Sequence, residues 1–136
     1  IRVIMGRSLG SAPAVEIAHR LPEEIDGLII ESGFAFTGPL LQLLGVDMTR
    51  LHICEEQGIG NLSKIGGIYK PTLIIHAQFD HIIPYREGEA LFAASPAREK
   101  KMLRIAGANH NNIFLAGMTE YMAAIEWLVG VAAHKA

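Results

Sequence analysis

The sequence predicts an α/β fold, in which a mostly parallel sheet of about four strands is covered by flanking helices. Two observations lead to this prediction. Short apolar runs, the pattern of strands buried on both faces, recur along the chain. Segments with apolar residues at helical spacing follow several of these runs. Strands that alternate with helices are typical of parallel sheets with right-handed crossover connections.

The first predicted unit is a strand followed directly by a helix. The strand covers residues 1–5, "IRVIM", and is expected to end at Gly6. A helix is expected over 11–21, because Pro13 suits a first helical turn and Pro22 stops the apolar periodicity.

Three more strands and two more helices continue this alternation. The strands are expected over 26–32 ("DGLIIES"), 71–77 ("PTLIIHA") and 100–106 ("KKMLRIA"). The helices are expected over 86–95 ("REGEALFAAS") and 119–136 ("TEYMAAIEWLVGVAAHKA").

The segment 34–70 interrupts the alternation. It is long for a crossover and is expected to hold one or two helices, as a cap or crossover insertion within a single domain covering 1–136. Its leucines either line a substrate pocket or pack a crossover helix on the sheet, and the sequence leaves both open. They are Leu40, Leu41, Leu43 and Leu44.

Composition narrows the classes of partner. The net charge of −2 and the absence of a Lys/Arg run argue against nucleic acid or an anionic membrane as a partner. The single cysteine, Cys54, is expected to be a buried small hydrophobe or a chemical bystander, and its isolation favours a reducing, cytoplasmic location. No apolar run has the roughly 18 residues of a membrane span. A targeting segment upstream of the chain stays open. No histidine pair has metal-ligand spacing, so no metal is expected.

The segment "GRSLG" (6–10) has the G-x-S-x-G spacing of a nucleophile elbow. A serine hydroxyl becomes a good nucleophile only when a base takes its proton, a third group orients the base and donors meet the oxyanion. The two glycines are expected to relieve crowding at a strained turn. Because the motif lies between a predicted strand and helix, Ser8 is expected at the carboxyl edge of the sheet, with the Leu9 N–H as an oxyanion donor.

A candidate acid and a candidate base follow later strands. Asp80 follows strand 71–77 and His110 follows strand 100–106, and the carboxyl ends of parallel strands meet at one edge. Glu31, at the end of an earlier strand, is an alternative acid. Asp80 is favoured over it because its loop leads toward the histidine strand.

These residues also have purely structural interpretations. Ser8 is compatible with a helix cap, Asp80 with an Asx-turn and His110 with a solvated turn. Arg7 is expected to pair with a carboxylate or the main chain, and His76 to be a core histidine bonded to the main chain.

Three segments of the chain resemble the α/β-hydrolase superfamily, in particular its small serine-esterase branch. "GRSLGSAPA", "KPTLIIHAQFDHIIP" and "IAGANHNNI" are similar to the nucleophile, acid and histidine blocks of that family. The resemblance implies the C-terminal part of an α/β-hydrolase fold, with Ser8 as nucleophile, Asp80 as orienting acid and His110 as base. It also implies a small-molecule or acyl substrate and no cofactor. Ala77 departs mildly from the pattern, since the family often has glycine there.

The resemblance further implies strands ahead of the nucleophile strand and a loop among them that supplies a second oxyanion donor. No segment of this chain corresponds to that loop, and losing one such donor typically costs about 10²–10³ in turnover. We therefore expect a serine hydrolase that cleaves a carboxylic ester or thioester through an acyl-enzyme, inactive or weakly active as this fragment. The alternatives are a non-catalytic truncated hydrolase module and a peptidase of the same fold.

The chain is more apolar than its length requires, with 50% hydrophobic residues besides its 14 glycines, against about 45–50% counted with glycine in average domains. We expect it to associate through the edge of strand 1–5 or with a missing N-terminal portion.

Overall fold

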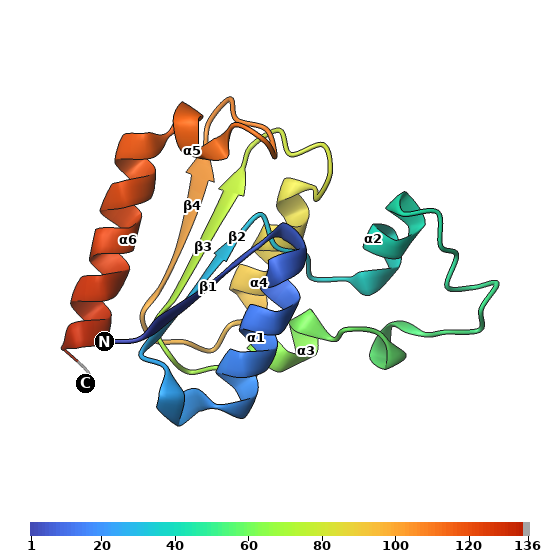
Figure 1. Cartoon of the computed structure of the whole chain (residues 1–136), viewed down its shortest axis with the longest axis horizontal. Helices are drawn as coiled ribbons and strands as arrows, with labels where there is room; N and C mark the ends of the chain where they lie inside the picture. The colour runs from blue at the N-terminus through green and yellow to red at the C-terminus, as the bar shows by residue number, and fades with distance from the viewer. Residues whose placement is uncertain (135–136) are drawn as a thin grey trace.

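The computed structural model describes residues 1–134, so the last two residues of the predicted helix 119–136 lie outside it. Within the described residues, four parallel strands form one sheet in the order β1-β2-β3-β4 (Figure 1). They are β1 (Val3–Arg7), β2 (Gly27–Glu31), β3 (Thr72–Ala77) and β4 (Lys100–Ile105). This confirms the predicted fold class, a mostly parallel sheet with flanking helices.

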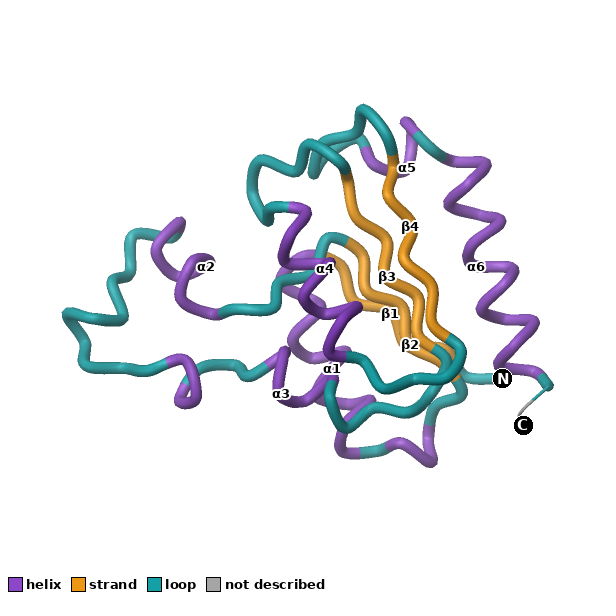
Figure 2. The backbone as a smooth tube through the Cα atoms, turned by 180° about the vertical axis from the view of Figure 1, so that it is seen from behind, coloured by secondary structure: helices purple, strands orange, loops and turns teal. Residues whose placement is uncertain are grey.

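Helices cover both faces of the sheet (Figures 1 and 2). One face carries α1 (Ser11–Arg20), α3 (Asn61–Ile65) and α4 (Tyr85–Ala94), and the other carries α6 (Met118–Ala133) after the short α5 (Ile113–Ala116). The 3₁₀ turns are η1 (Ser8–Gly10), η2 (Pro22–Glu24) and η3 (Glu55–Gln57). No helix in residues 1–134 is long and apolar enough to cross a membrane.

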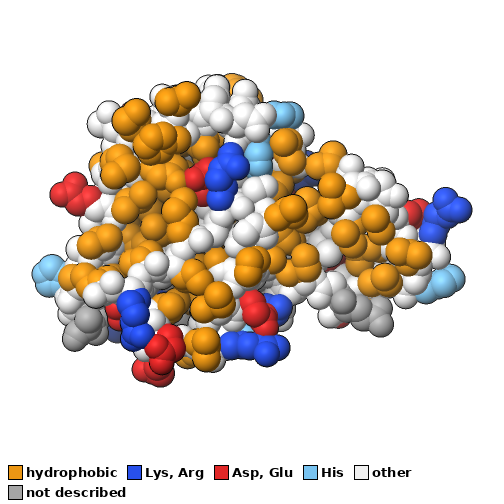
Figure 3. All heavy atoms as spheres, in the orientation of Figure 1, with side chains coloured by type: hydrophobic (Ala, Val, Ile, Leu, Met, Phe, Trp, Pro, Cys, Tyr) orange, Lys and Arg blue, Asp and Glu red, His pale blue; other side chains and the backbone are white. Residues whose placement is uncertain are grey.

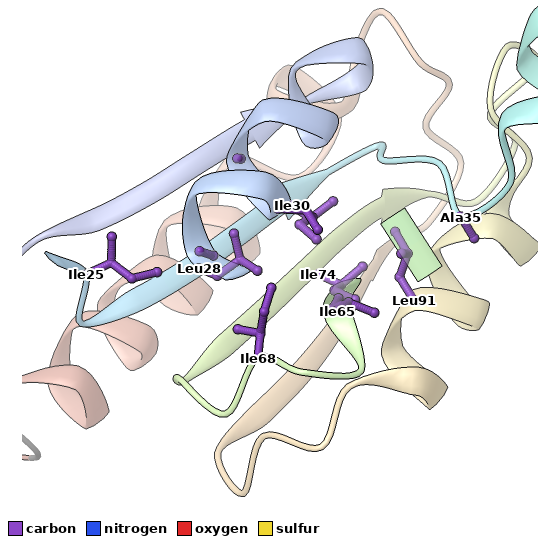
Figure 4. Packing of buried hydrophobic residues seen from close by; sticks show 11 residues of the cluster. Ile25, Leu28, Ile30, Ala35, Ile65, Ile68, Ile74 and Leu91 are labelled. Atoms are coloured by element: carbon purple, nitrogen blue, oxygen red, sulfur yellow. The ribbon is translucent and has the colours of Figure 1, made fainter. Parts of the chain in front are cut away.

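Two hydrophobic clusters hold these layers together, one on each face of the sheet. Alternate side chains of β2 and β3 enter opposite clusters, because successive residues of a strand point to opposite faces. Leu28, Ile30 and Ile74 pack against α1, α3 and α4 (Figure 4). Ile29, Leu73 and Ile75 pack against α6. Burial on both faces explains why these strands are continuously apolar in sequence.

The first strand extends further than predicted. It runs through Gly6 to Arg7, because both residues continue the parallel pairing with β2, opposite Ile30 and Glu31. The chain turns at the next residue, Ser8, whose φ of +54° lies in the left-handed region that side chains rarely occupy. Strand β1 therefore leads directly into a strained turn.

Of the two glycines flanking Ser8, one is required by space. A Cβ at Gly6 would lie 2.3 Å from the Gly10 carbonyl oxygen and 2.6 Å from the Ala14 Cβ. A Cβ at Gly10 would meet nothing within 4 Å. The expectation that both glycines relieve crowding is right for Gly6 and wrong for Gly10, since position 10 faces open space.

The segment 34–70 leaves the body of the sheet. Its first helix, α2 (Thr37–Leu43), stands apart from the strands (Figures 1 and 2). Leu40 is buried, but Leu43 and Leu44 are more than half exposed. The alternative in which these leucines pack a crossover helix on the sheet is therefore wrong. Whether 34–70 acts as a cap or as a crossover insertion stays a prediction.

Cys54 lies in the same excursion, and its side chain is exposed. The interpretation of Cys54 as a buried small hydrophobe is wrong, because this loop runs outside the two hydrophobic clusters.

Strand β1 is at the end of the sheet, and among the described residues only β2 pairs with it. Exposed apolar side chains lie on β1, just before it and on α6, and Figure 3 shows a broad hydrophobic area over these elements. They include Ile1, Met5, Met118, Met122 and Val129. An unpaired, apolar strand edge favours pairing with another chain. The expected association through residues 1–5 stays a prediction.

We expect the purified chain to self-associate with increasing concentration, because the free N–H and C=O groups of β1 can pair with another strand. Sedimentation measures the association, and hydrogen exchange should show protection gained at residues 3–7. Met5→Lys, which places a charge on the edge strand, should weaken it, whereas Tyr69→Lys, at an exposed loop position, should not. A monomer that stays stable at high concentration would contradict this prediction.

The two glycines of the turn should respond differently to substitution. Gly6→Ala should lower the free energy of unfolding by about 1–3 kcal/mol or more, because the methyl group collides with main chain that cannot move freely. Gly10→Ala should change it by at most about 1 kcal/mol, since position 10 has helical dihedrals and open space. Urea unfolding monitored by circular dichroism provides the comparison, and equal losses in both variants would refute it.

Candidate active site

Loops at the carboxyl ends of three strands bring together the three residues that the sequence singled out. Ser8 follows β1, Asp80 follows β3 and His110 follows β4. The His110 Nε2 lies 3.1 Å from the Ser8 Oγ, and the His110 Nδ1 lies 2.7 Å from the Asp80 Oδ2. Residues separated by 102 and 30 positions along the chain are thus within hydrogen-bonding distance of one another.

The Asp80 carboxylate is fixed by its own loop. Its Oδ1 accepts hydrogen bonds from the main-chain N–H groups of Ile82 and Ile83, at 2.9 and 2.8 Å. This Asx-type turn leaves Oδ2 directed at His110. Asp80 therefore forms the Asx-turn of its structural interpretation and contacts the imidazole at the same time.

His76 supports the same loop from the core. Its ring is fully buried, and its Nε2–H donates to the Ile83 carbonyl at 2.8 Å, as expected for a core histidine bonded to the main chain. Burial lowers the pKa of His76 and keeps the ring neutral near pH 7. The Nε2 also lies 3.6 Å from the Asp80 Oδ2, so this ring packs behind the carboxylate.

The bonding partners of His110 determine its tautomer. A carboxylate only accepts, so Nδ1 carries the proton and Nε2 presents a lone pair to the Ser8 hydroxyl. The His110 side chain is almost fully buried, whereas Ser8 is half-buried at the turn. In this arrangement the imidazole can take the Ser8 hydroxyl proton while the serine oxygen attacks a carbon of a molecule that approaches from solvent.

Glu31, the alternative acid, has other partners. Its Oε1 accepts from the Arg7 Nε at 2.8 Å, and its Oε2 accepts from the Tyr121 hydroxyl. The Arg7 guanidinium also donates to the His110 carbonyl oxygen at 2.6 Å. Between the two candidate acids, Asp80 is the one that contacts the imidazole. The pairing expected for Arg7 is confirmed with both a carboxylate and the main chain.

Leu9, the candidate oxyanion donor, is the middle residue of the η1 turn directly after Ser8. Its side chain is more than half exposed, so the turn presents this position to solvent. The role of its N–H stays a prediction.

Two residues at the site were missed by the sequence analysis. Tyr121 lies on α6 among ordinary helix-forming residues, and nothing in its neighbourhood marks it. Glu87 lies on the buried side of α4, where its carboxylate accepts from the N–H groups of Ala35 and Phe36 at 2.7 and 2.9 Å. Helical spacing could have revealed its burial, because Glu87 stands four residues before the buried Leu91 and so lies on the same helix face.

A cavity of about 240 Å³ adjoins the acid loop. Its wall contains Ile82 and Ile83, whose N–H groups hold the Asp80 carboxylate, and residues of α2 also line it. The lining is mainly apolar, with Phe34, Phe36, Leu40 and Leu43 among its residues. In the part of the chain that the structure describes, no group of three or more His, Cys, Asp or Glu residues could hold a metal ion.

Comparison with known proteins relates the chain to a family, although no protein-family model matches it. The chain is 33% identical over 117 residues to human alpha/beta hydrolase domain-containing protein 17B, an alignment that covers 85% of this chain and 37% of the relative. It is similarly related to protein 17C of Xenopus tropicalis, with 32% identity over 115 residues. The chain spans about a third of the length of these curated relatives.

Solved structures show the same fold at lower identity. A monoacylglycerol lipase from Paleococcus ferrophilus superposes with a TM-score of 0.71 at 20% identity, covering 94% of this chain and 68% of that one. The esterase domain of a Rhodothermus marinus protein gives 0.71 at 17% identity, covering 93% and 59%. The order of the site residues, the sheet that carries them and these relationships lead to one conclusion: the chain belongs to the α/β-hydrolase superfamily.

Proposed function

We propose that Ser8, His110 and Asp80 form a catalytic triad, and that the protein is a serine hydrolase that cleaves a carboxylic ester or thioester through an acyl-enzyme. The observation that supports this most directly is the continuous chain of contacts from the Ser8 Oγ through the imidazole to the Asp80 carboxylate, at 3.1 and 2.7 Å. The alternative interpretations of these residues, a helix cap and a solvated turn, account for neither contact.

In the first half-reaction, Oγ of Ser8 attacks the carbonyl carbon while Nε2 of His110 takes the hydroxyl proton. The carbonyl electron pair moves onto oxygen and forms a tetrahedral oxyanion. When it collapses, the bond to the leaving oxygen or sulfur breaks, and the imidazolium returns its proton to that atom. Asp80 holds the Nδ1–H throughout and stabilises the imidazolium.

The second half-reaction repeats these steps with water. His110 takes a proton from water, whose oxygen attacks the acyl carbon, and the proton then passes to the departing Ser8 Oγ. The acid product leaves and the serine hydroxyl is restored, so the cycle needs no cofactor.

Stabilisation of the oxyanion is assigned to the Leu9 N–H in this proposal. The positive φ of Ser8 supports it, because the left-handed residue makes the chain reverse sharply into the η1 turn at Leu9. A second donor would come from outside the described residues, as the family resemblance implies. The turnover of this chain alone should then fall below that of a complete site by about 10²–10³.

The apolar cavity beside the acid loop supports a substrate with an apolar group. Its residues belong to the 34–70 excursion, the loop after Asp80 and the first turn of α4, so an acyl or alcohol chain bound there would lie next to the loop that carries Asp80. The proposed substrate is therefore a small ester or thioester with a hydrophobic substituent.

A fluorophosphonate should label Ser8, because the probe reacts with serines that are activated by a base. Labelling should vanish in Ser8→Ala and fall by orders of magnitude in His110→Ala and Asp80→Asn. Asp47→Asn, at an exposed position outside the site, should label as the wild type does. Mass spectrometry of the labelled peptide identifies the site, and label that persists in Ser8→Ala would falsify the assignment. An unlabelled wild-type chain would favour the non-catalytic module.

Hydrolysis should depend on the cavity when the acyl chain is long. Leu43→Gln should lower the rate on p-nitrophenyl octanoate relative to the acetate by about fourfold, the effect of roughly one buried methylene. Leu44→Gln is the matched control, since Leu44 is similarly exposed but does not line the cavity. The ratio of the two rates is the measurement. Equal ratios in both variants and the wild type would exclude the cavity as the chain-binding site.

A further inference from the structure

Arg7 joins the nucleophile strand to the loop of the candidate base. It is the residue immediately before Ser8, and its guanidinium makes two bonds in different directions. The Nε donates to the Glu31 Oε1 at 2.8 Å, and one terminal nitrogen donates to the His110 carbonyl oxygen at 2.6 Å. A guanidinium suits this task, because its donors form a rigid planar fork.

The carboxylate that anchors Arg7 is itself fixed. Glu31 lies opposite Arg7 in the register of β1 and β2, and its side chain is only 5% exposed. A buried carboxylate is costly unless its oxygens have partners. Arg7 bonds to one of them, and the Tyr121 hydroxyl from α6 bonds to the other. Burial and the nearby Glu31 raise the pKa of Tyr121, so the hydroxyl remains a donor at neutral pH.

The His110 loop is held internally by asparagines. The Asn109 side chain accepts from the N–H groups of Asn111 and Asn112, and the Asn112 side chain accepts from the Asn109 N–H. These bonds shape the turn but do not connect it to β1. The bond from Arg7 makes that connection, and the contact between Ser8 and the imidazole closes a ring of three residues.

We propose that Arg7, fixed by Glu31 and Tyr121, is a positioning residue that sets the distance between the Ser8 hydroxyl and the His110 imidazole. This role rests on the proposed serine hydrolase function. The loop after β4 is also bonded to the loop after β3, where the Phe79 N–H donates to the Ala108 carbonyl oxygen at 2.9 Å, but that bond does not reach the turn after β1. The arginine ties the two loops at the residues next to the reacting atoms.

The ion pair of Arg7 and Glu31 also affects the net charge near the His110 imidazole. The imidazole faces Asp80 at Nδ1 and Ser8 at Nε2, with neutral His76 behind Asp80, and Arg7 and Glu31 lie on the side of its main-chain carbonyl. Because the two charges of the pair offset each other, removing either alone leaves a net charge beside the base. The two removals should therefore affect protonation of the base in opposite directions.

The test measures the second-order rate of Ser8 phosphonylation by a fluorophosphonate. Arg7→Met should lower this rate by about 10- to 100-fold, as expected when a base is displaced by about 1 Å. Arg7→Lys should restore part of it, since an ammonium keeps the charge but lacks the fork. Arg2→Met is the matched control, because Arg2 precedes β1 and pairs with Glu24 at an exposed site. It should react at the wild-type rate.

The pH profile separates positioning from a general loss of stability. The acid limb of the rate should move to lower pH in Glu31→Gln, where an unpaired guanidinium opposes protonation of the base. It should move to higher pH in Arg7→Met, where an unpaired carboxylate favours protonation. Shifts in the same direction, or no shift in either variant, would overturn the proposal.

Hydrogen exchange provides a readout that does not depend on reactivity. Arg7→Met should speed exchange in residues 106–112, and Arg2→Met should not. If the wild-type chain failed to react with the probe, the proposed hydrolase function would fall, and exchange alone would decide whether Arg7 ties the loop. If the wild type reacted and the Arg7 variants matched it in rate and exchange, the positioning role would be refuted.

Discussion

The left-handed backbone at Ser8 is the constraint on which the site depends. A residue with a side chain adopts a φ of +54° only where the surroundings hold it there. Strand β1 holds one side through its pairing with β2, and helix α1 holds the other. The two can approach closely because Gly6 has no side chain between them. The tight turn leaves the serine hydroxyl half-buried at the carboxyl edge of the sheet, within reach of the loops after β3 and β4.

The surrounding contacts each restrict one group at that edge. The loop after β3 closes on the Asp80 carboxylate through two main-chain donors, with His76 behind it. The ion pair of Arg7 and Glu31 connects the ends of β1 and β2 to the loop that carries His110. The carboxylates of Asp80 and Glu31 thus have partners that also fix their direction. Contacts that fix these groups are what proton transfer needs, because the reacting groups must lie within about 3 Å of one another.

Much of this could be predicted from the sequence, because it depends on local patterns. Apolar runs located the strands to within two residues, and the residues just after β3 and β4 had to meet at one edge of a parallel sheet. What could not be predicted depends on tertiary placement. The hydrogen bond from Tyr121 to Glu31 spans 90 residues. The exposure of Leu43 follows from α2 leaving the sheet, which its periodicity does not encode. The need for glycine at position 6 but not at position 10 depends on which side of the turn each faces.

The proposed mechanism requires a base-activated Ser8 to form a covalent acyl-enzyme. Rapid-quench mass spectrometry after mixing the protein with p-nitrophenyl acetate tests it most directly. We expect one acetyl group to appear on the peptide containing Ser8 together with the first p-nitrophenol released, and we expect it to be absent in His110→Ala. Acetyl groups confined to other side chains, or product released with no acetylated Ser8 at any time, would contradict it.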